Sequence, residues 1–466
     1  MAQEKNRKRV KIGLLGSGTV GGAIQDFIFK DQKRPDLDLE IVKIFTRHPE
    51  QKRWYSTYPK LFTTNPLEVV EHPEAEIIIE ALGFQNDQQI SEFKDYIIRA
   101  FKSGKGLVTS DKAVLARHGR EIWDAAARYG QELRFEACVG GGIPIIRSLT
   151  ESFAAEEPTA IYGIVNGTCN YILSEMAKSG KSYRVALREA QECGYAETNP
   201  ESDISGSDAE AKLILLAAVT FGVHVQPGKL WRQGINKIHA MDFLYAAKKA
   251  SCTIKHLAVA RSVGASLQAF VSPVLVPRSH FLSSIDGATN AIFFKGRRSE
   301  DDASREQPES RDWNYVFVGP GAGGGATAVA VLGDVMDLAR GRRQRVTGPP
   351  SLVAPGVLGL HSPDEILASF YIRFVVTDRA GIVGDICQTF GERDINISEV
   401  WQLSHSDEEL RRLAAGCGKD IGSRKILPFV ITLEPATVKQ VKQALEIVGQ
   451  QDYILLPPIW FPIWTD

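Results

Sequence analysis

The sequence lacks the features that would indicate a membrane protein, a nucleic-acid-binding protein or a disulfide scaffold. It has no run of about 18 apolar residues, so we expect no membrane-spanning helix. The formal net charge is only -1, which gives no electrostatic reason to expect nucleic acid or a membrane surface as a partner. Its six cysteines form no CxxC pair, and we interpret them as reduced thiols in a cytoplasmic protein.

The N-terminal part carries a nucleotide-binding pattern. Residues 10–15 are predicted to form a strand, and GSGTVG (16–21) follows before a helix, which is GxGxxG in its required context. Gly16 permits the turn, Gly18 lets the backbone approach a pyrophosphate, and Gly21 allows close packing of helix and strand. The predicted nucleotide contacts are therefore Gly16, Gly18, Thr19, Val20 and Gly21.

The choice of coenzyme depends on the end of the second predicted strand, LEIVKIF (39–45). Arg47 follows it between Thr46 and His48, where an NAD site would usually carry an acidic residue. A cationic side chain there suits a 2′-phosphate and favours NADP, with NAD still possible. The alternative is a solvated loop with no role in binding.

Strands and helices then alternate in the pattern of a doubly wound parallel sheet. Strands are predicted over 75–82 and 106–110, each followed by an amphipathic helix. Lys112 lies just beyond the second of these strands, at the edge where open α/β sheets bind ligands. An ordinary solvated lysine is the alternative.

A cluster of acidic residues and a lysine lies between Gly194 and Lys212. Residues 194–207 are predicted to form a loop and DAEAKLILLAAVTFG a buried helix, with Ser207 as N-cap. Asp208 and Lys212 are one turn apart on that helix, while Glu197 and Asp203 lie on the loop. The acids could hold an ammonium group and the lysine could offer a proton, as a small amino-acid substrate would require. An acidic loop with an ordinary ion pair is the alternative.

Six ordered motifs resemble homoserine dehydrogenase over residues 10–340. They are GLLGSGTVGG, SDKAVLA, FEACVGGGIPII, GIVNGTCNYIL, GYAETNPESDISGSDAEAKL and GPGAGGGATAVAVLGDVMDLAR. The resemblance implies a Rossmann-type domain, an α+β catalytic and dimerisation domain, and interconversion of L-homoserine and L-aspartate 4-semialdehyde. It also implies a homodimer.

The resemblance also implies roles for individual residues. Lys212 matches the proton donor, Lys112 a second active-site lysine beside the coenzyme, Glu197 and Asp208 the carboxylates that hold homoserine, and Asp203 a further acid. Main-chain oxygens of a turn that carries Glu136, Val139, Gly141 and Ile143 are implied to bind a structural sodium ion. Further coenzyme contacts are implied at Gly194, Gly321 and Gly323.

Three positions depart from the family pattern. Asp111 stands where asparagine is common, Asn199 where aspartate is usual, and Phe84 where a second glycine is common. Cys169 raises the possibility of a thiol nucleophile, but interconversion of an alcohol and an aldehyde needs no covalent intermediate. We interpret Cys169 as a small packing residue.

The C-terminal part resembles an ACT domain. After a Pro- and Gly-rich linker (341–367), residues 368–466 follow the order βαββαβ. Such modules bind amino-acid effectors, and the matching positions are Asp378, Gly381, Asn396 and Gln402. Threonine is the implied effector, and a role in oligomerisation alone is the alternative.

We therefore expect a nucleotide-binding domain (1–140), a catalytic and dimerisation domain (141–340), a linker (341–367) and an ACT-like domain (368–466). The expected activity is that of an NADP-preferring homoserine dehydrogenase. The alternatives are a dehydrogenase of another small amino-acid semialdehyde and a catalytically silent sensor of NADP and amino acids.

Overall fold

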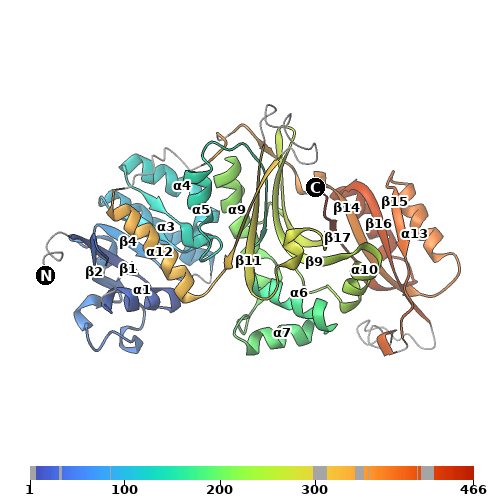
Figure 1. Ribbon diagram of the computed structural model, residues 1–466, viewed down its shortest axis with the longest axis horizontal. Coiled ribbons are helices and arrows are strands. Elements are labelled where there is room, and N and C mark those ends of the chain that lie inside the picture. Colours follow the sequence, from blue (N-terminus) through green and yellow to red (C-terminus); the bar gives the residue numbers. More distant parts are fainter. Residues whose placement is uncertain are drawn as a thin grey trace.

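The computed structural model describes residues 7–30, 34–83, 86–297, 312–341, 351–354, 356–406, 408–410 and 425–465. These residues form an elongated molecule in which a six-stranded sheet and an eleven-stranded sheet lie side by side (Figure 1). Phe84, Cys417 and most of the first half of the predicted linker lie outside the described residues. The five described cysteines are free thiols.

The six-stranded sheet confirms the predicted doubly wound fold. Its order is β3-β2-β1-β4-β5-β6 and every pair is parallel, which is the order of a dinucleotide-binding domain. Its strands are β1 (Lys8–Leu15), β2 (Leu37–Phe45), β3 (Phe62–Thr63), β4 (Ile77–Glu80), β5 (Gly106–Thr109) and β6 (Leu133–Arg134). Its helices are α1 (Thr19–Phe29), α2 (Leu67–Val70), α3 (Asp87–Lys102) and α4 (Lys112–Tyr129).

In the predicted catalytic domain, the strands of the larger sheet follow the order β12-β11-β7-β9-β10. Its strands are β7 (Pro158–Ile164), β9 (Cys252–Val263), β10 (Ser266–Pro277), β11 (Thr289–Arg297) and β12 (Asp312–Pro320), and the short β8 (Trp231–Arg232) pairs with β10. The helices are α5 (Ile145–Arg147), α6 (Gly167–Ser179), α7 (Tyr183–Glu192), α8 (Glu201–Ile204), α9 (Ser207–Phe221) and α10 (Ala240–Ala250).

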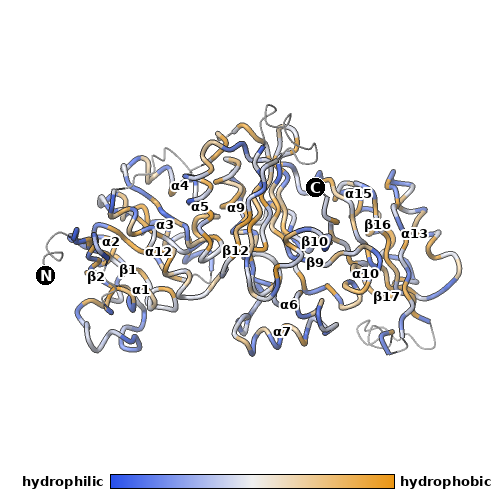
Figure 2. Tube along the Cα trace, in the orientation of Figure 1, coloured by the Kyte–Doolittle hydropathy of each residue, from blue (hydrophilic) through white to orange (hydrophobic). Residues whose placement is uncertain are grey.

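Helix α9 is the buried helix that the sequence predicts. From Leu213 to Val219 no side chain is more than 3% exposed, and Figure 2 shows hydrophobic residues along the strands beside it. A helix that is apolar all round must be enclosed by other elements. The charged residues of α9 are confined to its first turns, where they can serve chemistry.

Helix α12 (Gly324–Ala339) returns the chain to the nucleotide-binding domain. Val331 and Val335 are fully buried in the same hydrophobic cluster as Ile12 and Leu14 of β1, and Figure 1 shows α12 beside α1. The chain thus crosses between the two domains at residues 137–144 and again at 319–325. Both crossings are rich in glycine.

The C-terminal βαββαβ order is present. The elements are β14 (Leu367–Thr377), α13 (Ile382–Gly391), β15 (Ile397–Trp401), β16 (Ile426–Thr437), α15 (Val438–Gly449) and β17 (Ile454–Ile463). The order β17-β14-β16-β15 is antiparallel throughout, and β17 pairs with β10 so that this module extends the catalytic sheet. Trp460 stacks on Trp231 at 5.3 Å between ring centroids.

Part of the predicted linker is also held by main-chain hydrogen bonds to β10 and α9. The short β13 (Gly359–Leu360) pairs with β10, and Leu352 donates its N–H to the carbonyl of Val219 at 3.0 Å. None of the helices in the described ranges is both long and apolar enough to cross a membrane.

Candidate active site

Gly206 is the N-cap of helix α9, and its φ of 83° lies in the left-handed region. A β-carbon there would lie 3.2 Å from Cε1 of His256, so backbone angle and space both favour glycine. The prediction of a loop over 194–207, with Ser207 as the N-cap of the following helix, is wrong in two respects. Helix α8 occupies part of the loop, and Ser207 lies inside α9, where its hydroxyl donates to the Ser202 carbonyl at 3.0 Å.

Asp208, in the first turn of α9, is the centre of the site. Its Oδ2 lies 2.8 Å from Nζ of Lys212, which confirms that the two side chains lie one turn apart on one face of the helix. Its Oδ1 lies 3.1 Å from Nζ of Lys112, which the nucleotide-binding domain contributes. The structure therefore brings both predicted lysines to one carboxylate at the junction of the two domains.

The electrostatics of Asp208 follow from these neighbours. Burial opposes its ionisation, but the ammonium groups of Lys212 and Lys112 outweigh burial and hold the pKa of Asp208 well below its ordinary value. The Asp208 carboxylate raises the pKa of Lys112 against the opposing effect of desolvation. At neutral pH the site thus holds a permanent carboxylate and a permanent ammonium group.

Lys212 is buried and well oriented for donation. Its Nζ donates to the main-chain carbonyl of Val165 at 2.6 Å and to Asp208 at 2.8 Å. A lysine ammonium has three N–H groups, so among the described contacts one remains for a substrate oxygen. This geometry suits a proton donor.

Asn166 is a site residue that the sequence analysis missed. Its Oδ1 caps α6 by accepting from the N–H of Cys169 at 2.8 Å, as expected of asparagine before a helix. Its Nδ2 donates to Asp203 at 2.7 Å and to Asp208 at 2.9 Å. The Asn-Gly-Thr turn signals the cap, but nothing local signals the bridge between two distant acids.

Asp203 therefore belongs to the same cluster. Burial raises the pKa of Asp203 and the charge of Asp208 adds to this effect, while hydrogen bonds from Asn166 and Thr168 oppose it. Cys169 is fully buried and its thiol donates to the Asp203 carbonyl at 3.1 Å. Burial raises the pKa of the Cys169 thiol well above its ordinary value, so this residue suits packing and not nucleophilic attack.

Glu197 and Gly194 lie on the exposed loop between α7 and α8. The Glu197 carbonyl accepts from Gln191 at 3.1 Å, but its carboxylate is outside the Asp208 network. The unusual Asn199 accepts from the N–H of Glu201 at 3.3 Å and so helps to start α8. Glu197 thus remains open to a ligand from the solvent side.

Lys112 is the first residue of α4 and not a loop residue. Asp111 is the N-cap, since its Oδ1 accepts from the N–H of Ala113 at 2.8 Å and of Val114 at 3.2 Å. Asparagine and aspartate serve equally well as caps, which explains why Asp111 fits a position where the family commonly has asparagine. The cap fixes the direction in which Lys112 leaves the helix.

The glycine-rich turn has the shape that a pyrophosphate requires. A β-carbon at Gly16 (φ 108°) would lie 2.3 Å from the Ala81 carbonyl oxygen, and one at Gly21 would lie 2.2 Å from that of Gly16. A β-carbon at Gly18 would meet no heavy atom within 4 Å. Gly16 and Gly21 are therefore required by packing, whereas Gly18 faces open space at the start of α1, where Thr19 and Val20 follow.

The second glycine loop lies directly against this turn. A β-carbon at Gly324 would lie 2.7 Å from Cγ2 of Thr19, and one at Gly321 would lie 1.9 Å from Cγ of Asn290. Gly323 has a φ of 114°. The loop that carries Gly321 and Gly323 thus closes over the nucleotide turn from the catalytic side.

Arg47 is exposed after β2, beside the buried Thr46, where the sequence predicts it. Of the cations beyond it, Arg53 pairs with Asp26 of α1 at 2.8 Å. Arg47 is therefore better placed than Arg53 to meet a 2′-phosphate.

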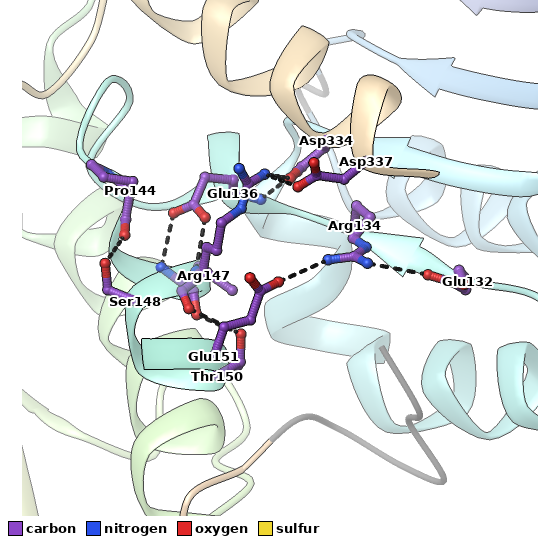
Figure 3. Close-up of polar contacts among 11 residues, drawn as sticks. Glu132, Arg134, Glu136, Pro144, Arg147, Ser148, Thr150, Glu151, Asp334 and Asp337 are labelled. Atoms are coloured by element: carbon purple, nitrogen blue, oxygen red, sulfur yellow. Dashed lines mark hydrogen bonds and ion pairs between the residues drawn. The ribbon is translucent and has the colours of Figure 1, made fainter. Parts of the chain in front are cut away.

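The turn proposed for sodium lies at the first domain crossing. The Glu136 carboxylate accepts from the N–H groups of Ile146 and Arg147, both at 2.8 Å, and Figure 3 shows Arg147 reaching on to Asp334 and Asp337 of α12. Burial raises the pKa of Glu136 to about 7, with the charge of Asp334 adding to the effect.

The carbonyls of this turn are held in place from the second crossing. Gly141 has a φ of 55°, and its β-carbon would lie 2.7 Å from the main chain of Gly321. The N–H of Gly142 donates to the Pro320 carbonyl at 2.9 Å. Val139 and Ile143 lie on either side of this tight turn, so the four named positions share one short stretch of backbone.

The four effector positions do not come together in one chain. Asp378 and Gly381 follow β14, and Gln402 follows β15 at the same end of the sheet, because Thr377 pairs with Ile426 and Trp401 with Val430. Asn396 precedes β15 and bonds Glu434 at 3.1 Å at the opposite end.

Comparisons with known proteins agree with this arrangement. Residues 16–136 match the model of the homoserine dehydrogenase NAD-binding domain, and residues 144–336 match that of homoserine dehydrogenase. The chain is 33% identical to the homoserine dehydrogenase of Bacillus subtilis over 85% of this chain and 88% of that one.

Solved structures show the same likeness. The homoserine dehydrogenase of Thiobacillus denitrificans covers 98% of this chain and 99% of its own at 29% identity, with a TM-score of 0.81. A hyperthermophilic archaeal homoserine dehydrogenase shares the fold at 24% identity, covering 72% of this chain and 99% of its own with a TM-score of 0.58.

Proposed function

We propose that this chain, which belongs to the homoserine dehydrogenase family, uses Lys212 as the proton donor and prefers NADP. As a homoserine dehydrogenase it is an NAD(P)-dependent oxidoreductase that interconverts L-homoserine and L-aspartate 4-semialdehyde. The observation that supports the proposed roles best is Asp208, which holds Lys112 and Lys212 from two domains at 3.1 and 2.8 Å.

In the reducing direction the aldehyde oxygen must receive a proton as its carbon receives a hydride. The nicotinamide coenzyme, when bound, supplies the hydride. Lys212 donates the proton from the N–H that neither Val165 nor Asp208 occupies. In the oxidising direction the same nitrogen, as the free amine, accepts the hydroxyl proton of homoserine.

The acids of the site hold the substrate. Glu197 is open to solvent and Asp208 is always ionised, so the two can take up the α-ammonium group of homoserine. Asp203 supports Asp208 indirectly, because the side-chain amide of Asn166 donates to both carboxylates. Lys112 joins the two domains through its ion pair with Asp208 and lies beside coenzyme and substrate.

The coenzyme fits the residues that are present. Gly16, Gly18 and Gly21 leave room for the pyrophosphate on α1, with Thr19 and Val20 at the helix start, and Gly321 and Gly323 close the other side. Arg47 recognises the 2′-phosphate, and Gly194 adds a contact from the loop. The archaeal relative was solved in complex with NADPH.

The coenzyme preference is tested by kcat/KM for homoserine oxidation with NADP and with NAD. The wild-type enzyme should favour NADP, and Arg47→Ala should lower kcat/KM for NADP by about tenfold while that for NAD stays within about twofold. Arg53→Ala is the matched control and should leave the preference unchanged. An equal loss with both coenzymes in Arg47→Ala would remove Arg47 from coenzyme recognition.

We further propose that main-chain oxygens of Glu136, Val139, Gly141 and Ile143 bind a sodium ion. A hard cation suits oxygen ligands, and the turn is held rigidly by Glu136 and the second glycine loop. Replacing sodium chloride by choline chloride should lower the melting temperature, and adding sodium back should restore it. An unchanged melting temperature would exclude the site.

The C-terminal module is proposed to be an ACT domain that binds threonine, in an enzyme that is a homodimer in the cytoplasm. Because Asn396 lies at the far end of β15 from Asp378, Gly381 and Gln402, a complete effector site would need Asn396 from a second copy. Threonine should inhibit the wild-type enzyme, and Gly381→Val should relieve inhibition without changing the uninhibited rate. No response to threonine would leave an oligomerisation role.

A further inference from the structure

Glu80, the last residue of β4, is a fully buried carboxyl group that the proposed chemistry does not use. A buried acid without a functional or structural partner would be costly, so its contacts call for an explanation. It lies at the carboxyl edge of the nucleotide-binding sheet, between the glycine-rich turn and the start of α4.

One oxygen of Glu80 supports the coenzyme side. Its Oε1 accepts from the N–H of Leu82 at 2.6 Å. The segment that begins at Ala81 lies against the nucleotide turn, since the N–H of Ala81 donates to the Leu15 carbonyl at 2.8 Å and the Ala81 carbonyl leaves no room for a β-carbon at Gly16. Glu80 therefore fixes the wall of the glycine-rich turn.

The other oxygen supports the lysine side. Oε2 of Glu80 accepts from the hydroxyl of Thr109, and that hydroxyl oxygen accepts from the N–H of Asp111 at 3.0 Å. Asp111 in turn caps α4, whose first residue is Lys112. A continuous series of hydrogen bonds thus leads from Glu80 to the helix start that aims Lys112 at Asp208.

We propose that Glu80 is a positioning residue that fixes the positions of the glycine-rich nucleotide turn and Lys112 relative to each other. This inference rests on the proposed role of Lys112. Sub-ångström placement of groups around a reacting centre controls rate, and a misplacement of about 1 Å can cost about a hundredfold. A carboxyl group that bonds both sides at once is suited to that task.

The charge state of Glu80 agrees with this role. Burial, and secondarily the Asp111 carboxyl, raises the pKa of Glu80 to about 8. The other ionisable groups around it are Lys112 on α4 and Cys138, whose thiol donates to the Thr109 carbonyl at 3.5 Å. At neutral pH Glu80 is mostly protonated, so Oε2 can donate to the Thr109 hydroxyl oxygen instead of accepting from it. In glutamine Nε2 can donate to the same oxygen while Oε1 still accepts from Leu82.

The test separates the two sides of the link in the full-length enzyme. Thr109→Val keeps the Glu80 contact to Leu82 but removes the hydroxyl that links Glu80 to the N–H of Asp111, so kcat should fall by about tenfold or more while the Kd for NADP stays within about threefold. Glu80→Ala should lower kcat and also weaken NADP binding. Glu80→Gln should keep kcat within about threefold of the wild type.

Lys105→Met is the matched control for general destabilisation. Lys105 is a buried ionisable residue just before β5, at the opposite edge of the same sheet, and it bonds the His72 carbonyl. Lys105→Met should lower the melting temperature about as much as Glu80→Ala does, while its kcat stays within about twofold of the wild type. If Glu80→Ala does not fold, Thr109→Val decides.

Wild-type kcat in Thr109→Val, or an equal loss of kcat in Lys105→Met, would overturn the proposal. So would an equal loss of kcat in Glu80→Gln and Glu80→Ala. Failure of the proposed function has a different signature, because Lys212→Met would then turn over like the wild type.

Discussion

Nζ of Lys112 lies 3.1 Å from Oδ1 of Asp208, and this contact joins the first turn of α4 in the nucleotide-binding domain to the first turn of α9 in the catalytic domain. Two helices that begin close together thus bring the residues proposed to bind coenzyme and substrate next to one another. Because Asp208 also pairs with Lys212, one carboxylate organises the charges of the whole site.

Replacing Asp208 by asparagine should therefore damage catalysis more than folding. Two ammonium groups would face each other without their shared counter-charge, and kcat/KM for homoserine should fall by about a hundredfold. Glu210 is a buried carboxylate on the same helix that pairs with the exposed Arg232 of β8 at 2.7 Å, so Glu210→Gln is the control. Equal losses of kcat/KM in the two variants would mean that Asp208 acts only through stability.

The glycine-rich turn gives a second prediction from two substitutions of equal size. Gly18→Ala places a methyl group in open space and should leave the melting temperature unchanged, but it should weaken NADP binding by about tenfold, because the backbone can no longer approach the pyrophosphate. Gly21→Ala collides with the Gly16 carbonyl and should lower the melting temperature. Thermal unfolding and equilibrium NADP titration of both variants check this. The reverse pattern would contradict the assignment of Gly18.

His256 makes the stability depend on pH in the acid range. Burial lowers the pKa of His256 to about 4 from an ordinary value of 6.5. Between these values the unfolded chain binds a proton that the folded chain does not, so the free energy of unfolding falls as pH falls from about 6.5 towards about 4. In His256→Gln the melting temperature should fall less over the same range. Identical pH dependence of the melting temperature in the wild type and in His256→Gln would contradict this role of His256.

A buried ion pair joins the C-terminal module to the catalytic domain. Arg373 of β14 lies 2.7 Å from Asp242 of α10, and Tyr371 donates to the same oxygen at 2.8 Å. Arg373→Met would leave Asp242 without its counter-charge and should lower the free energy of unfolding by about 3 kcal/mol. Urea unfolding measures this, with the exposed pair variant Lys442→Met as control. A loss no larger than that of Lys442→Met would show that the pair does not hold the module.

The sequence predicts those parts of the site that depend on local pattern. Gly16, Gly18 and Gly21 are identifiable because strand, turn and helix occur within a few residues, and Asp208 with Lys212 because both lie on one helix. The contact of Lys112 with Asp208 is different, since the two are far apart in the chain and only the family resemblance suggests it.

Other features depend on conformation that no pattern encodes. Ser207 is a better cap than glycine by residue type, yet Gly206 precedes the helix because the chain needs a positive φ beside His256. Glu80 is indistinguishable in sequence from any strand-end acid, and Asn166 from any N-cap. The pairing of β17 with β10 is equally non-local and appears only in the folded chain.

The most direct test of the account is kcat for NADP-linked oxidation of L-homoserine by the wild type and by Lys212→Met, with the Kd for NADP measured on both. Lys212→Met should lower kcat by about 10² to 10⁴-fold and leave the Kd for NADP unchanged, because the proposed role of Lys212 is to move a proton and its described contacts are with Val165 and Asp208, not with the nucleotide turn. Wild-type turnover in Lys212→Met, or weakened NADP binding with unchanged turnover, would contradict its assignment as the proton donor.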